Sequence, residues 1–486
     1  MNAHTTKAVG RRRVKRPAKT KAIGAYVGRE DAVGHLIDTL TAVHRSGSKV
    51  VIQSIEGPGG IGKTALFEHV LKHVDCGALK YVTMKVGGSP RKQSDPYELV
   101  QTLIGSSQTP VALSKPLAQR FTNTEEIRAV HTELMSQAGE ALATALPDIP
   151  IELLMEVLSA AVASGQRLNE FVPKTKLFLN FEAIEKRLPQ IEAALKTLAP
   201  LRDEVPGVLE KLGVGRSVAL RNAVRGNSLN ALAVAFVADL TALMSGYESS
   251  GRLRPAQARV PGLERLLLVV DDYESLVANF GEFLVGYLVP RLKQCTFETV
   301  LVILGRDQLA LSQTGWNQHH QGQLAPAIAL SALRREEMDE LVKARGRCSP
   351  EELDRAWGDT EGYPLLVTLW LEEAREAGPG AGPSIGMLKR FHDRTTHWLT
   401  EEQKRWLYHA LFLPKVNVKT FTAVLGNKDE ARRAMDWFEG DGSVRDATGA
   451  DFRVRPYVCS RLVAFLEAKD PECVHDVRAR AASTAA

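Results

Sequence analysis

A glycine-rich segment early in the chain has the residue types that hold a chain of phosphates. Residues 57–64 read G-P-G-G-I-G-K-T, the pattern G-x-x-x-x-G-K-T. Glycines let backbone N–H groups curl around a phosphate without a Cβ clash. Lys63 is expected to reach the β- and γ-phosphates, and the Thr64 hydroxyl to bind Mg²⁺. The residues predicted to bind the nucleotide phosphates are Gly57, Pro58, Gly59, Gly60, Ile61, Gly62, Lys63, Thr64 and Ala65.

The segments that flank this loop are the ones it needs for that chemistry. Residues 49–56, K-V-V-I-Q-S-I-E, are rich in β-branched residues and predict a buried strand. Residues 65–71 predict a helix, whose N-terminus adds partial positive charge beside the phosphates. The strand–loop–helix order favours a phosphate site over the alternative, a plain glycine-rich turn before a helix.

A second strand carries the acids that such a site requires. Residues 266–274 read L-L-L-V-V-D-D-Y-E, and five consecutive apolar residues indicate a central parallel strand covered on both faces. Its acids then emerge at the carboxyl end, beside the glycine loop. Asp271 is predicted to hold Mg²⁺, and Asp272 or Glu274 to orient the attacking water. The alternative is a core strand that ends in a polar loop.

Three further segments fit the same sheet. Residues 79–86, 298–304 and 327–333 each predict a buried strand. Arg306 follows the second of these, where a γ-phosphate would lie, although a surface salt bridge is the alternative. These segments together predict an α/β protein that binds and hydrolyses ATP.

The order of these motifs resembles that of bacterial STAND-type P-loop ATPases, an AAA+-related group that includes the NB-ARC and NACHT families. Residues 26–30, Y-V-G-R-E, are similar to the group's adenine-pocket segment and implicate Val27, Gly28 and Arg29. Arg306 matches the sensor-1 arginine, which adds a catalytic role to those of Lys63, Asp272 and Glu274. Residues 361–366 match the lid motif G-x-P, in which Pro364 turns the chain against the adenine.

The resemblance implies a parallel P-loop sheet of order 5-1-4-3-2 with a helical lid, a winged-helix domain and a helical insertion. Arg455 stands where the group has a histidine that senses the β-phosphate of ADP. An arginine could make that contact more strongly, or the ADP-bound state could be held differently. The expected divisions are a basic disordered tail (1–23), the ATPase domain (24–104 and 229–334), a helical insertion (105–228), the lid (335–392), the winged-helix domain (393–470) and a C-terminal tail (471–486).

The same resemblance implies a slow ATPase that acts as a molecular switch, with ATP or ADP and Mg²⁺ as its ligands. It also implies a homo-oligomer in the ATP state, a partner effector or sensor protein, and a role in bacterial antiphage or conflict defence. A DNA-binding AAA+ ATPase of the origin-binding or transposition-helper kind is one alternative. A nucleotide-bound scaffold with little turnover is another.

Composition limits the class of protein and its expected location. The 486 residues are 44% apolar and 24% charged, which is typical of a globular protein. Five scattered cysteines predict neither a zinc site nor a disulfide framework, and a cytoplasmic location is expected. The apolar stretch 229–244 carries Asp239 and is expected not to span a membrane. His319 and His320, in a Gln-rich segment, are expected to face solvent.

Two segments have open interpretations. Residues 1–22 hold eight lysines and arginines and no acid, so they predict a solvated arm or, alternatively, a DNA contact. Residues 105–228 contain amphipathic stretches at 151–161 and 181–195, with apolar residues three or four apart. They predict either extra helical packing on the ATPase domain or an arm that binds a partner.

Overall fold

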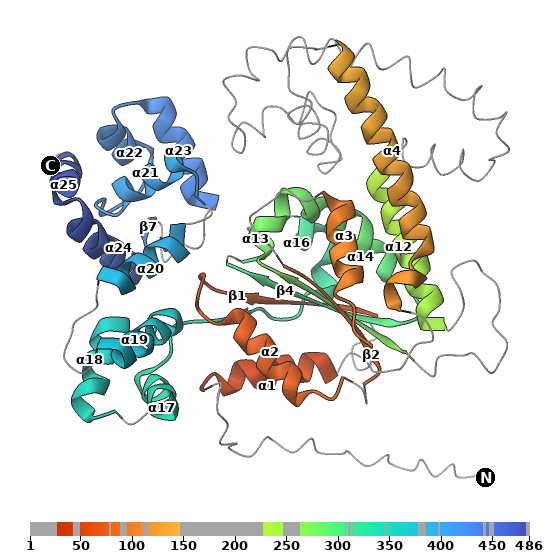
Figure 1. The fold of residues 1–486 in the computed structure, drawn as a ribbon, viewed down its shortest axis with the longest axis horizontal. Helices are drawn as coiled ribbons and strands as arrows, with labels where there is room; N and C mark the ends of the chain where they lie inside the picture. Colours follow the sequence, from red (N-terminus) through yellow and green to blue (C-terminus); the bar gives the residue numbers. More distant parts are fainter. Residues whose placement is uncertain are drawn as a thin grey trace, which may run out of the picture.

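Five parallel strands form the central sheet of this computed structural model: β1 (Val50–Glu56), β2 (Tyr81–Gly87), β3 (Arg265–Asp271), β4 (Glu298–Gly305) and β5 (Ile328–Ala329). Their order is β2-β3-β4-β1-β5, which confirms the predicted order 5-1-4-3-2 (Figure 1). The edge strand β5 is shorter than the predicted 327–333, and only two of its residues pair with β1. The structure describes residues 27–145 and 227–482, apart from 42–48, 77–78, 88–94, 110–115, 246–262, 307, 310–312, 314, 346–347, 378–384, 397–398, 441–443 and 447–451.

Alternation along the strands divides the apolar residues between the two faces of the sheet. Leu267 and Val269 of β3 pack in the core that contains helices α1 (Glu30–Thr41) and α2 (Lys63–His73). Leu268 and Val270 point to the other face, because successive side chains of a strand alternate. Both faces are therefore covered, as the run of apolar residues predicts.

The second face is covered by several helices (Figure 1). They are α3 (Pro96–Gly105), α12 (Ser228–Ser245), α13 (Tyr273–Leu276), α14 (Val289–Leu292), α16 (Gly315–His320) and the π-helical segments η5 (Val277–Gly281) and η6 (Phe283–Leu288). Short 3-10 turns η2 (Leu117–Arg120) and η7 (Gln321–Gln323) connect other elements. His320 corrects one expectation: it is only 1% exposed, and its Nε2 lies 2.8 Å from the Val285 carbonyl oxygen, whereas His319 is exposed.

A buried aspartate joins the start of α4 (Thr122–Ala145) to α12. Asp239 accepts hydrogen bonds from the backbone N–H and the hydroxyl of Thr124, both at 2.8 Å, and from the side chain of Asn123 at 2.8 Å. The first turn of a helix has N–H groups without intrahelical acceptors, and Asp239 supplies one from a neighbouring helix. By length and composition α12 could cross a membrane, but half of it is buried, and its nine buried residues are Asp239 and eight that pack in the core.

The boundary predicted at 392/393, between the lid and the winged-helix domain, falls inside the helix α20 (Ile385–Thr396). The lid consists of α17 (Arg335–Arg345), α18 (Pro350–Thr360) and α19 (Pro364–Ala377). The winged-helix domain consists of α21 (Glu401–Ala410), α22 (Val418–Leu425), α23 (Lys428–Gly440), the hairpin β6 (Arg445–Asp446) and β7 (Arg453–Val454), and α24 (Pro456–Lys469).

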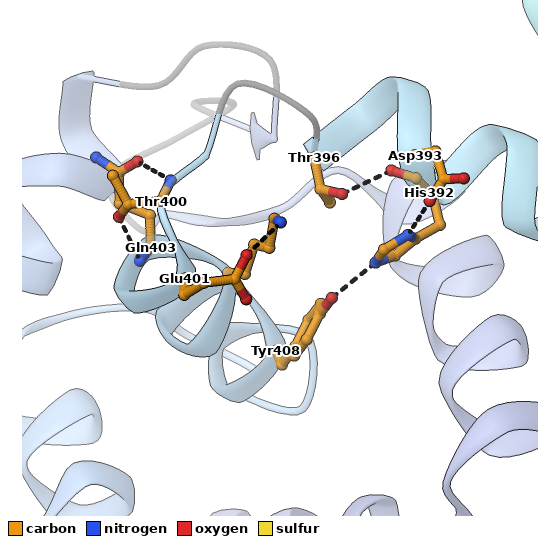
Figure 2. A network of polar contacts seen from close by, with 8 residues as sticks. His392, Asp393, Thr396, Thr400, Glu401, Gln403 and Tyr408 are labelled. Carbon is orange, nitrogen blue, oxygen red and sulfur yellow. Dashed lines mark hydrogen bonds and ion pairs between the residues drawn. The ribbon is translucent and has the colours of Figure 1, made fainter.

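His392 fastens α20 to its neighbours (Figure 2). Its Nδ1 lies 3.0 Å from the Asp393 carboxylate and its Nε2 lies 2.7 Å from the Tyr408 hydroxyl on α21. The ring also stacks on Phe465 of α24, with centroids 4.4 Å apart. Burial lowers the pKa of His392, and the neighbouring Asp393 opposes that shift. Because a carboxylate only accepts, Nδ1 donates to Asp393. By its packing, α20 therefore belongs with the winged-helix domain.

The C-terminal segment is a second correction. Residues from 471 onward were expected to form a tail, yet Pro471–Ala482 is the helix α25, which packs on α22 and α24. Val474, Val477 and Ala481 form its buried side. The predicted basic tail, the stretches 151–161 and 181–195 and the hairpin tip at Thr448 and Gly449 lie outside the described residues.

We expect Asp239→Ala to lower the free energy of unfolding by about 2–4 kcal/mol, because it leaves several buried donors without an acceptor. Urea unfolding measures the loss, and hydrogen exchange in the first turn of α4 should rise with it. The matched control is Asp436→Ala, an exposed site on α23 where we expect a change within about 0.5 kcal/mol. Equal costs in the two variants would contradict this role of Asp239.

Candidate nucleotide-binding site

The glycine loop takes a backbone shape that requires its glycines. Gly57, Gly60 and Gly62 have φ angles of +143°, +80° and +97°, values that side chains strongly disfavour. A Cβ atom on Gly57 would lie 2.8 Å from the Leu330 carbonyl oxygen, and one on Gly60 would lie 2.8 Å from Leu365. The loop is therefore both tightly turned and closely covered, and it ends at Gly62, the residue before α2.

Lys63 begins α2 and lies folded over the loop. It is only 7% exposed, and its Nζ donates to the carbonyl oxygens of Gly57 at 2.6 Å and Pro58 at 3.3 Å. Burial lowers the pKa of Lys63, and this effect outweighs the opposing one of the nearby acid Glu274. A phosphate oxygen would compete with these carbonyl oxygens for the ammonium group, and would win by its charge.

The acids predicted at the end of β3 meet the loop. The Thr64 hydroxyl lies 3.1 Å from Asp271 Oδ2 and 3.3 Å from Oδ1, although the two residues are 207 positions apart. The backbone N–H of Asp272 donates to Asp271 Oδ1 at 3.0 Å, which fixes the carboxylate. A hydroxyl and a carboxylate placed together are ligands that suit Mg²⁺, so the residues fit that metal.

Glu274 and Arg306 form an ion pair at the neighbouring strand ends. Arg306 Nε lies 2.5 Å from Glu274 Oε1, and the Arg306 backbone N–H donates to Glu274 Oε2 at 3.2 Å. Burial raises the pKa of Glu274, although the positive charges of Arg306 and Lys63 oppose that shift. A Cβ atom on Gly59 would lie 3.8 Å from Arg306 Cζ. Arg306 therefore lies between the glycine loop and Glu274.

Asp272 stands next to this pair in an uncommon backbone conformation. Its φ and ψ are 52° and 47°, in the left-handed region, directly before α13. Its negative charge contributes to the raised pKa of Glu274. The structure thus brings Lys63, Thr64, Asp271, Asp272, Glu274 and Arg306 together, and the catalytic roles of these residues stay predictions.

The predicted adenine segment is bound to the first helix of the lid. The backbone N–H of Arg29 donates to Glu337 of α17 at 3.2 Å, and its guanidinium donates to the Ser331 carbonyl oxygen at 2.7 Å. Gly28, at φ +74°, faces the same glutamate, and a Cβ atom there would lie 2.6 Å from its carboxyl carbon. Val27 precedes this pair. Their contact with the adenine stays a prediction.

Tyr363 is a site residue to which the sequence analysis assigned no role. Its hydroxyl donates to the carbonyl oxygen of Gly59 in the glycine loop. The preceding Gly362 has φ +70°, and a Cβ atom there would overlap the Leu333 carbonyl oxygen at 2.1 Å. Pro364 then begins α19. The lid motif therefore places a hydroxyl, rather than only a proline, against the loop.

Arg455 lies in the winged-helix domain between β7 and α24. Its backbone N–H donates to the Val444 carbonyl oxygen at 2.8 Å, and its own carbonyl oxygen accepts from Cys459 in α24. This geometry places Arg455 at the foot of the hairpin, as the resemblance implied. Its contact with a β-phosphate stays a prediction.

We expect Lys63→Ala to weaken ATP binding by about 1.5–3 kcal/mol, because it removes one charge-assisted contact to the phosphates. This corresponds to roughly 10- to 150-fold in dissociation constant. Isothermal titration calorimetry measures it, with Lys72→Ala as the control, since Lys72 is exposed on the same helix. Unchanged affinity in the Lys63 variant would rule out the phosphate site.

The similarity of this chain to known proteins is distant. No protein-family model matches the chain, and no curated protein is significantly similar to it. A Walker-type ATPase of Pyrococcus abyssi is 12% identical, with 90% of this chain and 96% of that chain covered and a TM-score of 0.44. The Aeropyrum pernix ORC1 protein, solved in complex with DNA, is 12% identical (93% and 95% covered, TM-score 0.38).

The Aeropyrum pernix ORC2 protein, described as ADPNP-ADP complexes, is also 12% identical, with 91% of this chain and 95% of that chain covered and a TM-score of 0.36. These likenesses are distant, so the fold assignment rests on the chain's own geometry. A parallel sheet of order β2-β3-β4-β1-β5, with the glycine loop after β1 and the acids after β3, is the fold of a P-loop ATPase.

Proposed function

We propose that this protein binds ATP with Mg²⁺, hydrolyses it slowly, and acts as a STAND-type switch whose ATP and ADP forms differ in assembly. The observation that supports this most directly is the contact of Thr64 with Asp271 beside the glycine loop, over which Lys63 is folded. Thr64 and Asp271 would hold Mg²⁺, which supplies charge neutralisation at the transferred phosphate. The Tyr363–Gly59 hydrogen bond connects the lid to the same loop.

The ion pair between Glu274 and Arg306 suggests how hydrolysis is controlled. Arg306 holds both carboxylate oxygens of Glu274, one through Nε and one through the backbone N–H. A γ-phosphate would attract the Arg306 guanidinium, because its charge exceeds that of one carboxylate. Glu274 would then be released to orient the attacking water.

The lid is the element that nucleotide would move. Tyr363 and Leu365 both contact the glycine loop, at Gly59 and Gly60, so a change in the loop would be transmitted to α19. Arg461 of α24 donates to the Gly358 carbonyl oxygen of α18 at 3.2 Å, which connects the lid to the winged-helix domain. A ligand moves such an equilibrium only by its differential affinity for the two forms. The proposed ADP contact of Arg455 would supply part of that difference.

DNA binding is the alternative that the basic N-terminal segment raises, and that segment lies outside the described residues. In the winged-helix domain, which such an ATPase would also use to contact DNA, the exposed charged residues of α23 are three basic and three acidic. They are Lys428, Arg432 and Arg433, with Asp429, Asp436 and Glu439. Balanced charge gives little net attraction to phosphates, so we favour the switch. A steep salt dependence of binding to duplex DNA would reverse that preference.

We propose that the protein forms a homo-oligomer in the ATP state and binds a protein partner that acts as sensor or effector. A role in bacterial conflict defence is supported only by the resemblance to the STAND group.

We expect Asp271→Asn and Glu274→Gln to fail in different ways. Asp271→Asn should weaken Mg²⁺-dependent ATP binding, because it removes charge from the metal's ligands. Glu274→Gln should retain ATP but slow hydrolysis, since water loses its orienting group. Phosphate release under single-turnover conditions, together with ATP retention on a filter, separates the two. If Asp272→Asn traps ATP and Glu274→Gln turns over normally, Asp272 is the residue that orients the attacking water. If the wild type does not hydrolyse ATP, the result favours the nucleotide-bound scaffold.

The switch predicts a larger assembly with a non-hydrolysable ATP analogue than with ADP, measured by size-exclusion chromatography with light scattering. Tyr363→Phe removes the hydroxyl that bonds Gly59 and so loosens the lid from the glycine loop. Because the lid should then move more easily, the analogue concentration needed for assembly should fall by about two- to tenfold. Tyr408→Phe is the control, because that hydroxyl bonds His392 away from the loop. Identical sizes in both nucleotides would contradict the switch.

A further inference from the structure

A lysine lies on the acid that is proposed to hold Mg²⁺. Lys85 Nζ is 3.3 Å from Asp271 Oδ2, the same oxygen that lies 3.1 Å from the Thr64 hydroxyl. The Lys85 side chain is 36% exposed and that of Asp271 is 15% exposed. A positive charge therefore already stands at an oxygen that the metal would need.

The position of Lys85 is set by its strand. Val82, Met84 and Val86 of β2 are buried in the core, and Lys85 projects to the opposite face by alternation. β2 runs parallel to β3, with Gly87 paired to Asp271, so Lys85 stands two residues before the carboxyl end at which the acid emerges. A side chain at Gly87 would begin 3.6 Å from Asp271 Cβ.

The backbone of Lys85 is also clamped from outside the sheet. Its N–H donates to the Ser106 hydroxyl oxygen at 2.8 Å, and that hydroxyl donates to the Lys85 carbonyl oxygen at 2.6 Å. Thr83 and Gln108 exchange two backbone hydrogen bonds beside them. These bonds hold the strand edge and so fix the backbone from which the Lys85 side chain extends to Asp271.

We propose that Lys85 substitutes for the charge of Mg²⁺ at Asp271 and competes with the metal for it. It holds the carboxylate when no metal is bound and leaves Oδ2 when Mg²⁺ arrives, because the positive charges of the ammonium group and the divalent cation repel each other at one oxygen. Lys85 thereby sets the Mg²⁺ concentration at which the nucleotide binds tightly. This inference rests on the proposed function, since it concerns the same site.

The test is a Mg²⁺ titration of the full chain at a fixed concentration of a fluorescent ATP analogue. Lys85→Met should reach half-maximal binding at about 1.5- to fivefold less Mg²⁺ than the wild type, the range expected for a partly exposed pair. Lys85→Arg, which keeps the charge, should behave as the wild type. Lys80→Met is the matched control, because Lys80 precedes the same strand and pairs with Glu264, far from the metal acid.

A second readout uses the metal alone. Without nucleotide, Lys85→Met should have a lower melting temperature in a chelator than the wild type and should gain more stability on addition of Mg²⁺. An unchanged or higher Mg²⁺ requirement in Lys85→Met would overturn the proposal. So would weaker nucleotide binding in a chelator, because it would make Lys85 a phosphate ligand. If the wild type binds no nucleotide, the proposed function fails, and the metal-only titration still decides the role of Lys85.

Discussion

The contact between Thr64 and Asp271 is the constraint on which the candidate site depends. It joins a hydroxyl at the start of α2 to a carboxylate at the end of β3, 207 residues apart, within 3.1 Å. The contact exists because β1 and β3 are parallel and only β4 separates them, so their carboxyl ends share one edge of the sheet. The packing of helices on both faces keeps that edge in register. Any slip of β3 against β4 would carry Asp271 away from the loop.

Around this contact, three cationic side chains have protein partners that a phosphate or a metal could replace. Lys63 donates to loop carbonyl oxygens, Arg306 pairs with Glu274, and Lys85 pairs with Asp271. When a ligand replaces the protein partner, the charge of Lys63 or Arg306 stays compensated, which limits the free energy that the exchange costs. Because Tyr363 of the lid contacts the loop, the same exchange would also act on the lid, outside the ATPase domain.

Much of this arrangement could be predicted from the sequence, because its strongest signals are local. The glycine loop and the apolar run before Asp271 followed from residue types and spacing, whereas the strand order came from the resemblance to STAND-type ATPases. Lys85 was missed because a lysine near a strand end is usually a solvated residue. It becomes informative only when β2 is seen beside β3. Tyr363 and Asp239 were missed since their partners, Gly59 and Thr124, are distant in the chain. The packing of α20 and α25 likewise depends on tertiary contacts that periodicity does not reveal.

A crystal structure with Mg²⁺ and a non-hydrolysable ATP analogue tests the central assignment most directly. We expect the β- and γ-phosphates to lie within the glycine loop. Lys63 Nζ should contact their oxygens instead of the Gly57 carbonyl oxygen. The metal should lie near the Thr64 hydroxyl, on the side of Asp271. A nucleotide bound elsewhere on the chain, with Lys63 still on Gly57 and no metal near Thr64, would contradict it.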